Sequence, residues 1–424
     1  MIARDPGTTR AAFLLAFLTL INVLNFADRF LMQGFAVDII ADLQLSNFQF
    51  TLLTGFVFTV FYTFMGLLMG ALADRVHRPR LMAVGLFAWS ALTAATGAVG
   101  SFLQIAVVRM FTGVGEATLT PAALGLLGDV FHQRQRAFAA GCYYLGAPIG
   151  IGGTYLIAGT LGAAIGWRNC FYTLGVLGVG LSLVLLRLHE PRAAESATGA
   201  ATHRSLSSAI GEIRAALLAS PALCLTIVGG ILVILAQGML VLDQLWLVQE
   251  RTFSKTDAQN LAGAMFLAGG VTGSILGGVL ADSMQARRAG GRLLFLAASY
   301  AIGVPVGCLY RYSDPAGDLF YACMFVGSVM VTIGYGPIFA IVQDLVAPRI
   351  LSTMTAFLIL CMTLLGTSTG NLFAGWLADF FKQQSQNQPL TLVALLGLLP
   401  WLLAIPCFHL AARLVERRPQ ARPA

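Results

Sequence analysis

The stretch GALADRVHRPR, residues 70–80, ends a long apolar run with a group of charges and has a counterpart later in the chain. The counterpart, GGVLADSMQARR at residues 277–288, also places an aspartate four residues after a glycine and closes with arginines. A second pair of similar segments, DVFHQRQRAFAAG (129–141) and DLVAPRILSTMTAF (344–357), each links a fourth apolar run to a fifth. Corresponding segments at corresponding places indicate a duplicated bundle of helices.

The composition indicates an all-α integral membrane protein. Of 424 residues, 57% are hydrophobic and only 11% are charged, with a mean hydropathy of +0.79, which lies outside the range of soluble globular domains. Because an apolar run of about 20 residues crosses a bilayer as a helix, we predict twelve transmembrane helices. They cover residues 11–37, 48–72, 80–99, 101–128, 137–161, 168–188, 221–248, 257–283, 291–311, 318–345, 351–379 and 390–412.

The basic residues are distributed by side of the membrane. With both termini cytoplasmic, 19 of the 26 lysines and arginines fall in inner segments. The outer loops hold five (Arg168, Arg251, Lys255, Arg311 and Lys382), and two lie within spans. This bias orients the protein, so the net charge of +7 requires no nucleic-acid partner. No secretory cleavage pattern precedes the first run, and we expect a multi-pass protein of the plasma (inner) membrane.

A polar linker divides the chain. Residues 189–220 separate an N-terminal six-helix bundle (1–188) from a C-terminal one (221–412), and residues 413–424 form a cytoplasmic tail. In the second half of the linker, apolar residues recur at helical intervals, at Leu206, Ile210, Ile213 and Leu217. The spacing favours a short amphipathic helix on the cytoplasmic face of the membrane, with a flexible connector as the alternative.

Charged residues interrupt the first apolar run. An aspartate and an arginine, Asp28 and Arg29, stand together in LINVLNFADRFLMQ, residues 20–33. A charge at the centre of a membrane helix costs roughly 2.5–3.5 kcal/mol on insertion scales, so such residues usually face a protein interior or water. Asn22, Asn25 and Gln33 share one helical face with Arg29, which predicts a polar stripe for substrate. The alternative is that the charged pair only joins interhelical hydrogen bonds.

The fourth apolar run carries a second charged pair. Arg109 and Glu116 are seven residues apart, which places them on the same helix face. Gly113 and Gly115 between them permit close approach of a neighbouring helix. An arginine stays charged, so Arg29 and Arg109 suit the binding of a phosphate or carboxylate. A carboxylate can gain or lose a proton, although Glu116 could instead form a permanent salt bridge to Arg109 or to a helix-1 residue.

Other polar positions have packing as their default interpretation. Thr367 and Asn371 line one face of the eleventh predicted helix and are candidates for substrate binding. Gly146 and Pro148 in the fifth helix resemble a degenerate antiporter motif, and they also suit packing or a bend. Asp243, near the outer end of the seventh helix, is more consistent with an interfacial, solvated carboxylate than with a coupling group.

The sequence contains no arrangement of residues that is typical of an enzyme site. The seven cysteines stand singly and the five histidines fall in loops or at helix ends, so we expect no disulfide framework, metal site or cofactor. No nucleophile with a base and no nucleotide-binding loop is evident. A membrane enzyme and a transport-incompetent sensor are therefore less consistent with the sequence than a transporter.

The repeated segment resembles the signature loop of the major facilitator superfamily. In that family an aspartate after the second helix and the arginines that follow form a conformational latch on the cytoplasmic side. The matching residues are Gly70, Asp74, Arg75, Arg78 and Arg80, with Asp282 in the second copy. His77 stands where the family usually has glycine. The resemblance implies twelve helices in two pseudo-symmetric six-helix bundles and transport by alternating access.

Two further segments resemble the Spinster branch of this superfamily, which moves sphingosine phosphate and lysophospholipids. They are NFADRFLMQGFAVDI (25–39) and RMFTGVGEA (109–117). The organic anion:cation symporters carry similar elements, and both resemblances imply proton coupling at Asp28 and Glu116.

We therefore expect a monomeric, proton-coupled transporter of an amphipathic anionic or zwitterionic lipid. Its partners would be the bilayer, protons and that substrate. A sugar-acid symporter and a multidrug antiporter are the alternatives.

Overall fold

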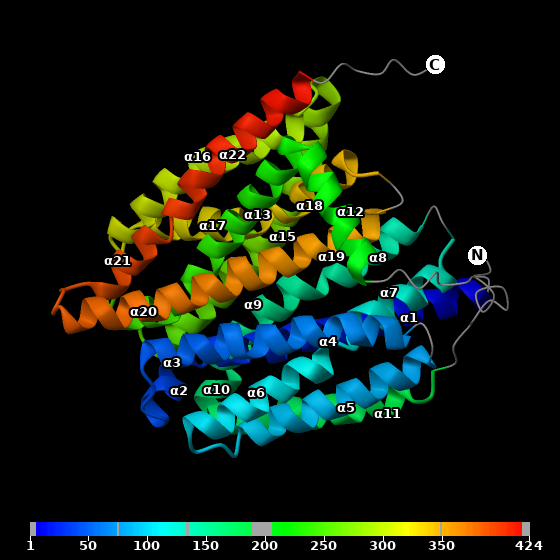
Figure 1. Cartoon of the computed structure of the whole chain (residues 1–424). Helices are drawn as coiled ribbons and strands as arrows, with labels where there is room; N and C mark the ends of the chain where they lie inside the picture. Colours follow the sequence, from blue (N-terminus) through cyan, green and yellow to red (C-terminus); the bar gives the residue numbers. More distant parts are fainter. Residues whose placement is uncertain (1–5, 74–75, 133–134, 189–205, 348–349, 418–424) are drawn as a thin grey trace, which may run out of the picture. The chain divides into compact units, whose positions relative to one another are not determined.

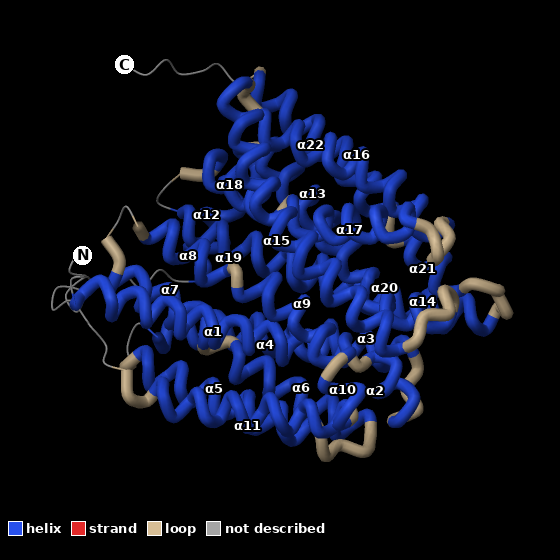
Figure 2. The backbone as a smooth tube through the Cα atoms, turned by 180° about the vertical axis from the view of Figure 1, so that it is seen from behind, coloured by secondary structure: helices blue, strands red, loops and turns tan. Residues whose placement is uncertain are grey.

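Every regular element that the structure describes is a helix. The computed structural model describes residues 6–73, 76–132, 135–188, 206–347 and 350–417 (Figure 1, Figure 2). Several predictions fall outside these residues: the latch residues Asp74 and Arg75, the first part of the linker (189–205), and the extreme ends of the chain, on which the expected cytoplasmic termini depend.

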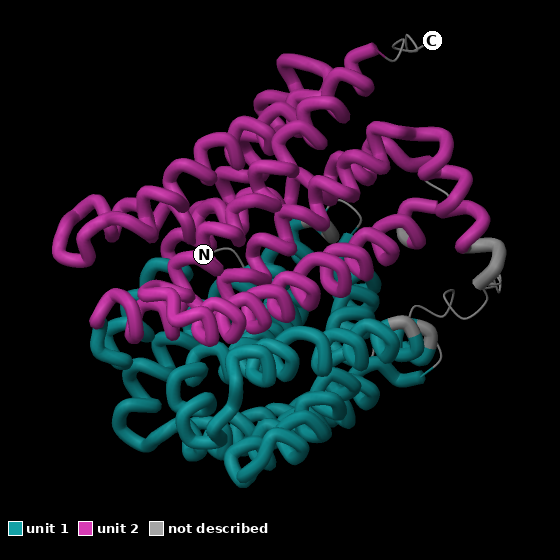
Figure 3. The backbone as a smooth tube through the Cα atoms, turned by 60° about the vertical axis from the view of Figure 1, so that its left-hand side comes forward, with its two compact units in different colours: residues 1–201, 253–267 teal, residues 202–252, 268–424 magenta. Residues whose placement is uncertain are grey.

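The chain forms two compact units, which Figure 3 shows in two colours. Unit 1 comprises Met1–Ala201 and Phe253–Leu267. Its helices are α1 (Pro6–Gly34), α2 (Ala36–Asp42), α3 (Asn47–Leu52), the π-helix η1 (Leu53–Val57), α4 (Phe58–Ala73), α5 (Arg78–Thr96), α6 (Phe102–Glu116), α7 (Leu119–Val130), α8 (Arg136–Tyr144), α9 (Gly146–Gly159), α10 (Leu161–Ile165) and α11 (Trp167–Leu185).

Unit 2 comprises Thr202–Thr252 and Ala268–Ala424. Its helices are α12 (Leu206–Ala219), α13 (Pro221–Met239), the 3₁₀-helix η3 (Leu240–Leu242), α14 (Asp243–Gln249), α15 (Lys255–Arg287), α16 (Gly291–Tyr312), α17 (Asp318–Ile333), α18 (Tyr335–Leu345), α19 (Leu351–Cys361), the π-helix η5 (Met362–Ser368), α20 (Thr369–Gln383), α21 (Pro389–Leu396) and α22 (Leu399–Glu416). The first part of α15 groups with unit 1, which the sequence did not indicate.

The predicted spans correspond to observed helices. Among the described residues, eleven helical stretches are long and apolar enough to cross a membrane, and each coincides with a predicted span to within a few residues. The remaining predicted span, 80–99, is α5, which is not among the eleven. It nevertheless packs within unit 1, against α6 and α11. Short breaks divide several spans into two helices, as at α6 and α7.

Serine side chains mark where several helices begin. Ser46, Ser101 and Ser220 each accept a hydrogen bond from a backbone N–H in the first turn of α3, α6 and α13. These caps satisfy donors that have no partner inside the helix. Pro221 follows Ser220, and its fixed φ suits the first helical position.

Close glycine contacts hold the helices of unit 1 together. In α9, a Cβ on Gly150 would lie 2.5 Å from the Val23 carbonyl oxygen, and one on Gly146 would lie 2.8 Å from the Asn22 amide. The backbones of α9 and α1 therefore approach through glycine, as small residues allow in membranes. These contacts favour the packing interpretation for Gly146 of the antiporter-like motif, and Pro148 of the same motif is buried as well.

The core of unit 2 surrounds α13. This helix packs against α22, η5 and α20, and α16 packs against α22. Gly229 of α13 faces the ring of Phe408, and the indole of Trp401 donates to the Val233 carbonyl. The predicted amphipathic helix of the linker is α12, whose Ile213 and Leu217 pack against this core while Ile210 is exposed.

Candidate functional site

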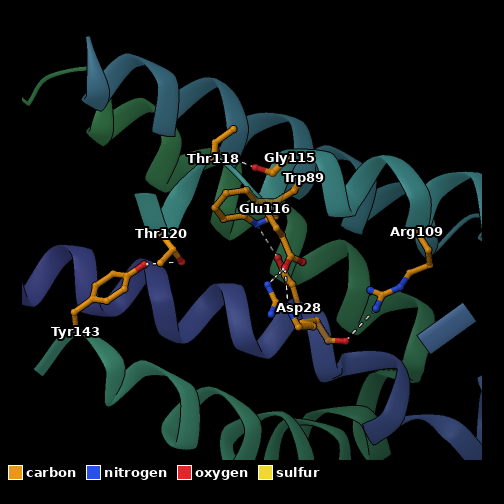
Figure 4. A network of polar contacts seen from close by, with 9 residues as sticks. Asp28, Trp89, Arg109, Gly115, Glu116, Thr118, Thr120 and Tyr143 are labelled. Atoms are coloured by element: carbon orange, nitrogen blue, oxygen red, sulfur yellow. Dashed lines mark hydrogen bonds and ion pairs between the residues drawn. The ribbon is translucent and has the colours of Figure 1, made fainter. Parts of the chain in front are cut away.

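Charged side chains of α1 and α6 meet inside unit 1. Asp28 and Glu116 are each 1% exposed and Arg109 is 2% exposed, whereas the Arg29 side chain keeps 19% of its surface accessible. Figure 4 shows how Asp28, Glu116 and Arg109 come together. Ionisable residues at this depth of a membrane helix mark a functional site by default.

Arg29 and Glu116 form an ion pair. The Arg29 Nε and Nη2 donate to the same carboxylate oxygen, Glu116 Oε2, at 3.1 and 2.9 Å. Of the two roles that the sequence left open for Glu116, the salt bridge to a helix-1 residue is thus present, and the titrating role stays a prediction. Asn25, predicted to bind substrate, is buried beside the same carboxylate.

Arg109 has a different partner. Its Nη2 donates to the backbone carbonyl of Arg29 at 3.1 Å. The seven-residue spacing predicted that Arg109 and Glu116 share a face, and both side chains do reach α1. They bind different groups there: the Glu116 carboxylate accepts from the Arg29 guanidinium, and the Arg109 guanidinium donates to the Arg29 backbone carbonyl.

Aromatic rings surround the two guanidinium groups. The Arg29 Cζ lies 4.3 Å from the Tyr62 ring centroid, 5.0 Å from that of Phe58 and 5.2 Å from that of Phe26. The Arg109 Cζ lies 4.9 Å from the Phe58 centroid. Aromatic faces attract cations, so these rings stabilise both charges where water is scarce. Phe58 and Tyr62 were not predicted as site residues, since aromatic residues are common in membrane helices.

Asp28 is bound by a tryptophan that the sequence pattern did not predict as a site residue. The Trp89 Nε1 of α5 donates to Asp28 Oδ2 at 3.1 Å, and the ring is fully buried (Figure 4). A buried indole N–H normally has an acceptor. A tryptophan within an apolar helix was therefore the sequence feature that could have indicated a buried polar partner for Trp89. Asp28 and Arg29 therefore have separate partners, although they are neighbours in sequence.

The remaining polar residues of the helix-1 stripe have different surroundings. The Asn22 amide donates to the Tyr143 carbonyl at 2.8 Å, which ties α1 to α8. The Tyr143 hydroxyl in turn lies 3.4 Å from the Thr120 hydroxyl. Gln33 is half-buried, about one turn beyond Arg29. Substrate binding by Asn22 and Gln33 stays a prediction, and the contact of Asn22 favours a packing role.

Thr367 and Asn371 lie in unit 2. The Asn371 amide nitrogen donates to the Gly238 carbonyl at 2.9 Å and to the Thr367 carbonyl at 3.1 Å, so its buried side chain joins α20 to α13. A Cβ on Gly370 would lie 2.2 Å from the Leu235 carbonyl oxygen, which shows how tightly these helices cross. These contacts favour the packing interpretation for Asn371.

The predicted latch contains an ion pair that occurs in both units. In unit 1, Arg78 at the start of α5 pairs with Asp129 near the end of α7. In unit 2, Arg292 at the start of α16 pairs with Asp344 near the end of α18 and, at 2.8 Å, with Asp282 of α15.

The other described latch residues have few contacts. Gly70 has open space on its Cβ side, the nearest atom being Pro121 Cβ at 3.9 Å, and Arg80 is exposed. The latch role of these residues stays a prediction.

Arg311 is placed differently from the prediction. The sequence assigned it to an outer loop, but it lies in the last turn of α16 and is buried. Its Nη2 binds Asp243 Oδ1 at 2.6 Å and its guanidinium stacks 4.2 Å from the Trp246 ring. Asp243 is therefore an ion-pair partner, partly exposed, rather than a freely solvated carboxylate. The loop assignment was wrong because α16 ends at Tyr312, so Arg311 belongs to the end of the span predicted at 291–311.

The chain matches a known family over most of its length. Residues 18–368 match the family described as Major Facilitator Superfamily. The chain is 24% identical over 386 residues to Protein spinster of Drosophila melanogaster, a match that covers 89% of this chain and 63% of that protein. It is 27% identical over 417 residues to an MFS-type efflux pump of Mycolicibacterium smegmatis, over 97% of this chain and 95% of the pump.

The fold is also found in a solved structure. A bacterial homolog of the human lysosomal transporter Spinster, crystallised in an inward-facing and occupied conformation, superposes with a TM-score of 0.82. The two share 23% sequence identity over 97% of this chain and 99% of that chain, a level at which the likeness concerns the fold alone. The chain therefore belongs to the major facilitator superfamily, a family of membrane transporters rather than enzymes, and is similar to its Spinster branch.

Proposed function

We propose that the protein is a proton-coupled secondary transporter that moves an amphipathic anionic or zwitterionic lipid by alternating access. The observation that carries this proposal is the buried group of two guanidinium and two carboxylate side chains on α1 and α6, which we call the charge cluster: Asp28, Arg29, Arg109 and Glu116. The similarity to the Spinster branch supports the lipid class of substrate.

The charge cluster links protonation to anion binding. With both carboxylates ionised its charges cancel, and a proton on either carboxylate leaves it with a net positive charge. Arg29 is bound by Glu116 in this structure and is also the most accessible member of the charge cluster. A proton on Glu116 would weaken that ion pair and release the Arg29 donors for a substrate oxyanion, so protonation and binding would favour each other.

Selectivity would come from the head group. Burying an acyl chain gains about 0.8 kcal/mol per CH₂ when the chain leaves water, but almost nothing when it leaves the bilayer. Arginine forks bind phosphate and carboxylate in two-pronged geometry. The chemistry of the head group should therefore matter more than the length of the chain.

Competition for a bound fluorescent lysolipid tests this assignment. Purified protein would be challenged with lysophosphatidylcholine, lysophosphatidylethanolamine, sphingosine phosphate and a hexuronate. We expect displacement by the phospholipid-like competitors. Displacement by the hexuronate alone would contradict the lipid assignment and favour a sugar-acid symporter.

Drug export is a second candidate, which the likeness to the MFS-type efflux pump favours. A cationic drug that displaced the lysolipid and was moved against a pH gradient would support it. Two arginines balance the two carboxylates of the charge cluster, and Glu116 is ion-paired with Arg29, so the charge cluster has no excess negative charge to attract a cation and lipid transport is the better supported function.

A further inference from the structure

The two carboxylate oxygens of Asp28 have different surroundings. The Trp89 indole can donate one hydrogen bond and can accept none, and it donates to Asp28 Oδ2 at 3.1 Å (Figure 4). The other oxygen, Oδ1, is also buried. A hydrogen bond to an ionised carboxylate is stronger than one to the neutral acid. Trp89 thus affects the two protonation states of Asp28 differently.

We propose that Trp89 is a positioning residue for proton transfer at Asp28, holding Oδ2 so that the proton binds Oδ1 and stabilising the ionised form. The inference rests on the proposed proton coupling at Asp28. Trp89 has no proton of its own to exchange in this role and acts only through the carboxylate.

Helix packing fixes the indole in place. A Cβ on Gly115 of α6 would lie 2.9 Å from the Trp89 Cβ and 3.0 Å from its backbone nitrogen, so α5 and α6 touch at this point. A Cβ on Gly85, one turn earlier in α5, would lie 1.9 Å from the Thr118 hydroxyl. Because Gly115 directly precedes Glu116, the backbone and Cβ of Trp89 are packed against the helix segment that carries the second carboxylate.

The groups around Asp28 come from three other helices besides its own. From α6, Glu116 and Arg109 act on it through their charges. From α5, Trp89 and Thr93 face it, and neither side chain ionises at physiological pH. From α9, Thr154 binds the neighbouring carbonyl of Ala27 at 3.0 Å. On α1 itself, Arg29 is bound to Glu116. The donor to Oδ2 is therefore a neutral group, distinct from the charges nearby.

The indole N–H itself reports on Asp28. We would label the five tryptophans of the full-length protein with ¹⁵N and follow their indole N–H signals by NMR across a pH series. Trp89→Phe assigns the Trp89 signal, or variants of the other four tryptophans assign it if Trp89→Phe does not fold. We expect this signal to titrate in the wild type and to stop titrating in Asp28→Asn. A signal that is constant with pH, or that titrates equally in Asp28→Asn, overturns the inference.

Transport provides the second readout. Trp89→Phe keeps an aromatic ring and removes the donor, so the midpoint of the pH dependence of transport should move to higher pH by about one unit. Trp401→Phe is the matched control, since it removes an indole bond to the Val233 carbonyl and should leave the midpoint unchanged. An unchanged midpoint in folded Trp89→Phe overturns the inference alone. If wild-type transport does not depend on pH, the proposed function is contradicted instead. The NMR titration then still decides the role of Trp89.

Discussion

Arg29 makes two kinds of contact, an ion pair and contacts with aromatic rings, and only the ion pair is weakened when Glu116 is protonated. Its ion pair with Glu116 depends on the charge of the carboxylate, whereas its contacts with Tyr62 and Phe58 depend only on the aromatic faces. Loss of the ion pair therefore leaves the guanidinium held over the rings with its donors available. This arrangement is suited to exchanging a fixed carboxylate for the oxyanion of a ligand.

Glu116→Gln should make lysolipid binding less dependent on pH. The amide imitates the protonated acid, so Arg29 is released at every pH and binding at high pH should rise toward its value at low pH. Equilibrium binding across a pH series measures this. Glu416→Gln, which alters a surface ion pair with Arg288, is the control and should behave as the wild type does. An unaltered pH dependence in Glu116→Gln would mean that Glu116 has only a structural role.

Arg109→Lys should weaken binding even though the charge is kept. An ammonium lacks the planar fork that can hold the Arg29 carbonyl and a second oxygen together. The loss of one hydrogen bond to a charged group, about 1.4 kcal/mol, corresponds to about tenfold in affinity. Titration of the fluorescent lysolipid measures the change. Equal affinity in the variant would assign Arg109 to helix packing alone.

At the scale of elements, apolar length predicts where helices lie but not what they touch. Asp28, Arg29, Arg109 and Glu116 were predicted as site residues because charges are conspicuous in apolar runs. Trp89 was not predicted as a site residue, because its hydrogen-bond partner, Asp28, is 61 positions away in the sequence. Asn371 was predicted to bind substrate because its acceptor, the Gly238 carbonyl, belongs to another helix and cannot be identified from the sequence. Contacts between helices are what the single sequence left undetermined.

Gly150→Ala should destabilise unit 1. The added methyl group would lie 2.5 Å from the Val23 carbonyl and 2.7 Å from the Phe26 Cβ, so α9 must move away from α1. Overpacking of this kind costs typically about 1–3 kcal/mol. Gly153→Ala, in the same helix, meets open space and is the matched control. Thermal unfolding in detergent should show a lower midpoint for Gly150→Ala only, and equal midpoints would contradict the close contact.

At the scale of the whole molecule, each unit contains an ion pair of the same kind. Each unit joins the start of one helix to the end of another by an arginine and an aspartate, Arg78 with Asp129 and Arg292 with Asp344. The two aspartates begin the similar segments 129–141 and 344–357, whereas Arg292 lies beyond the repeat at 277–288, so the sequence indicated the duplication but not this ion pair. Ion pairs that join helix ends are suited to stabilising one conformation over another.

Arg78→Gln and Arg292→Gln should slow transport several-fold and leave lysolipid affinity unchanged, because neither pair includes a residue of the charge cluster. Asp42→Asn, which alters a partly exposed pair with Arg168, is the control and should transport normally. Transport rates in liposomes and equilibrium binding together make the comparison. Lost binding with normal transport kinetics would contradict a role in conformational switching.

Proton flux in response to substrate tests the central claim most directly. Purified protein in liposomes that contain a pH-sensitive dye would receive lysolipid in the absence of any other ion gradient, alongside Asp28→Asn and a control, Asp314→Asn, which alters an exposed carboxylate. We predict that lysolipid movement carries protons in the wild type and in Asp314→Asn, and that Asp28→Asn moves lysolipid only by exchange, without protons. Substrate-driven proton flux in Asp28→Asn at the wild-type rate would contradict proton coupling at Asp28, and lysolipid movement without protons in the wild type would contradict proton coupling by the charge cluster.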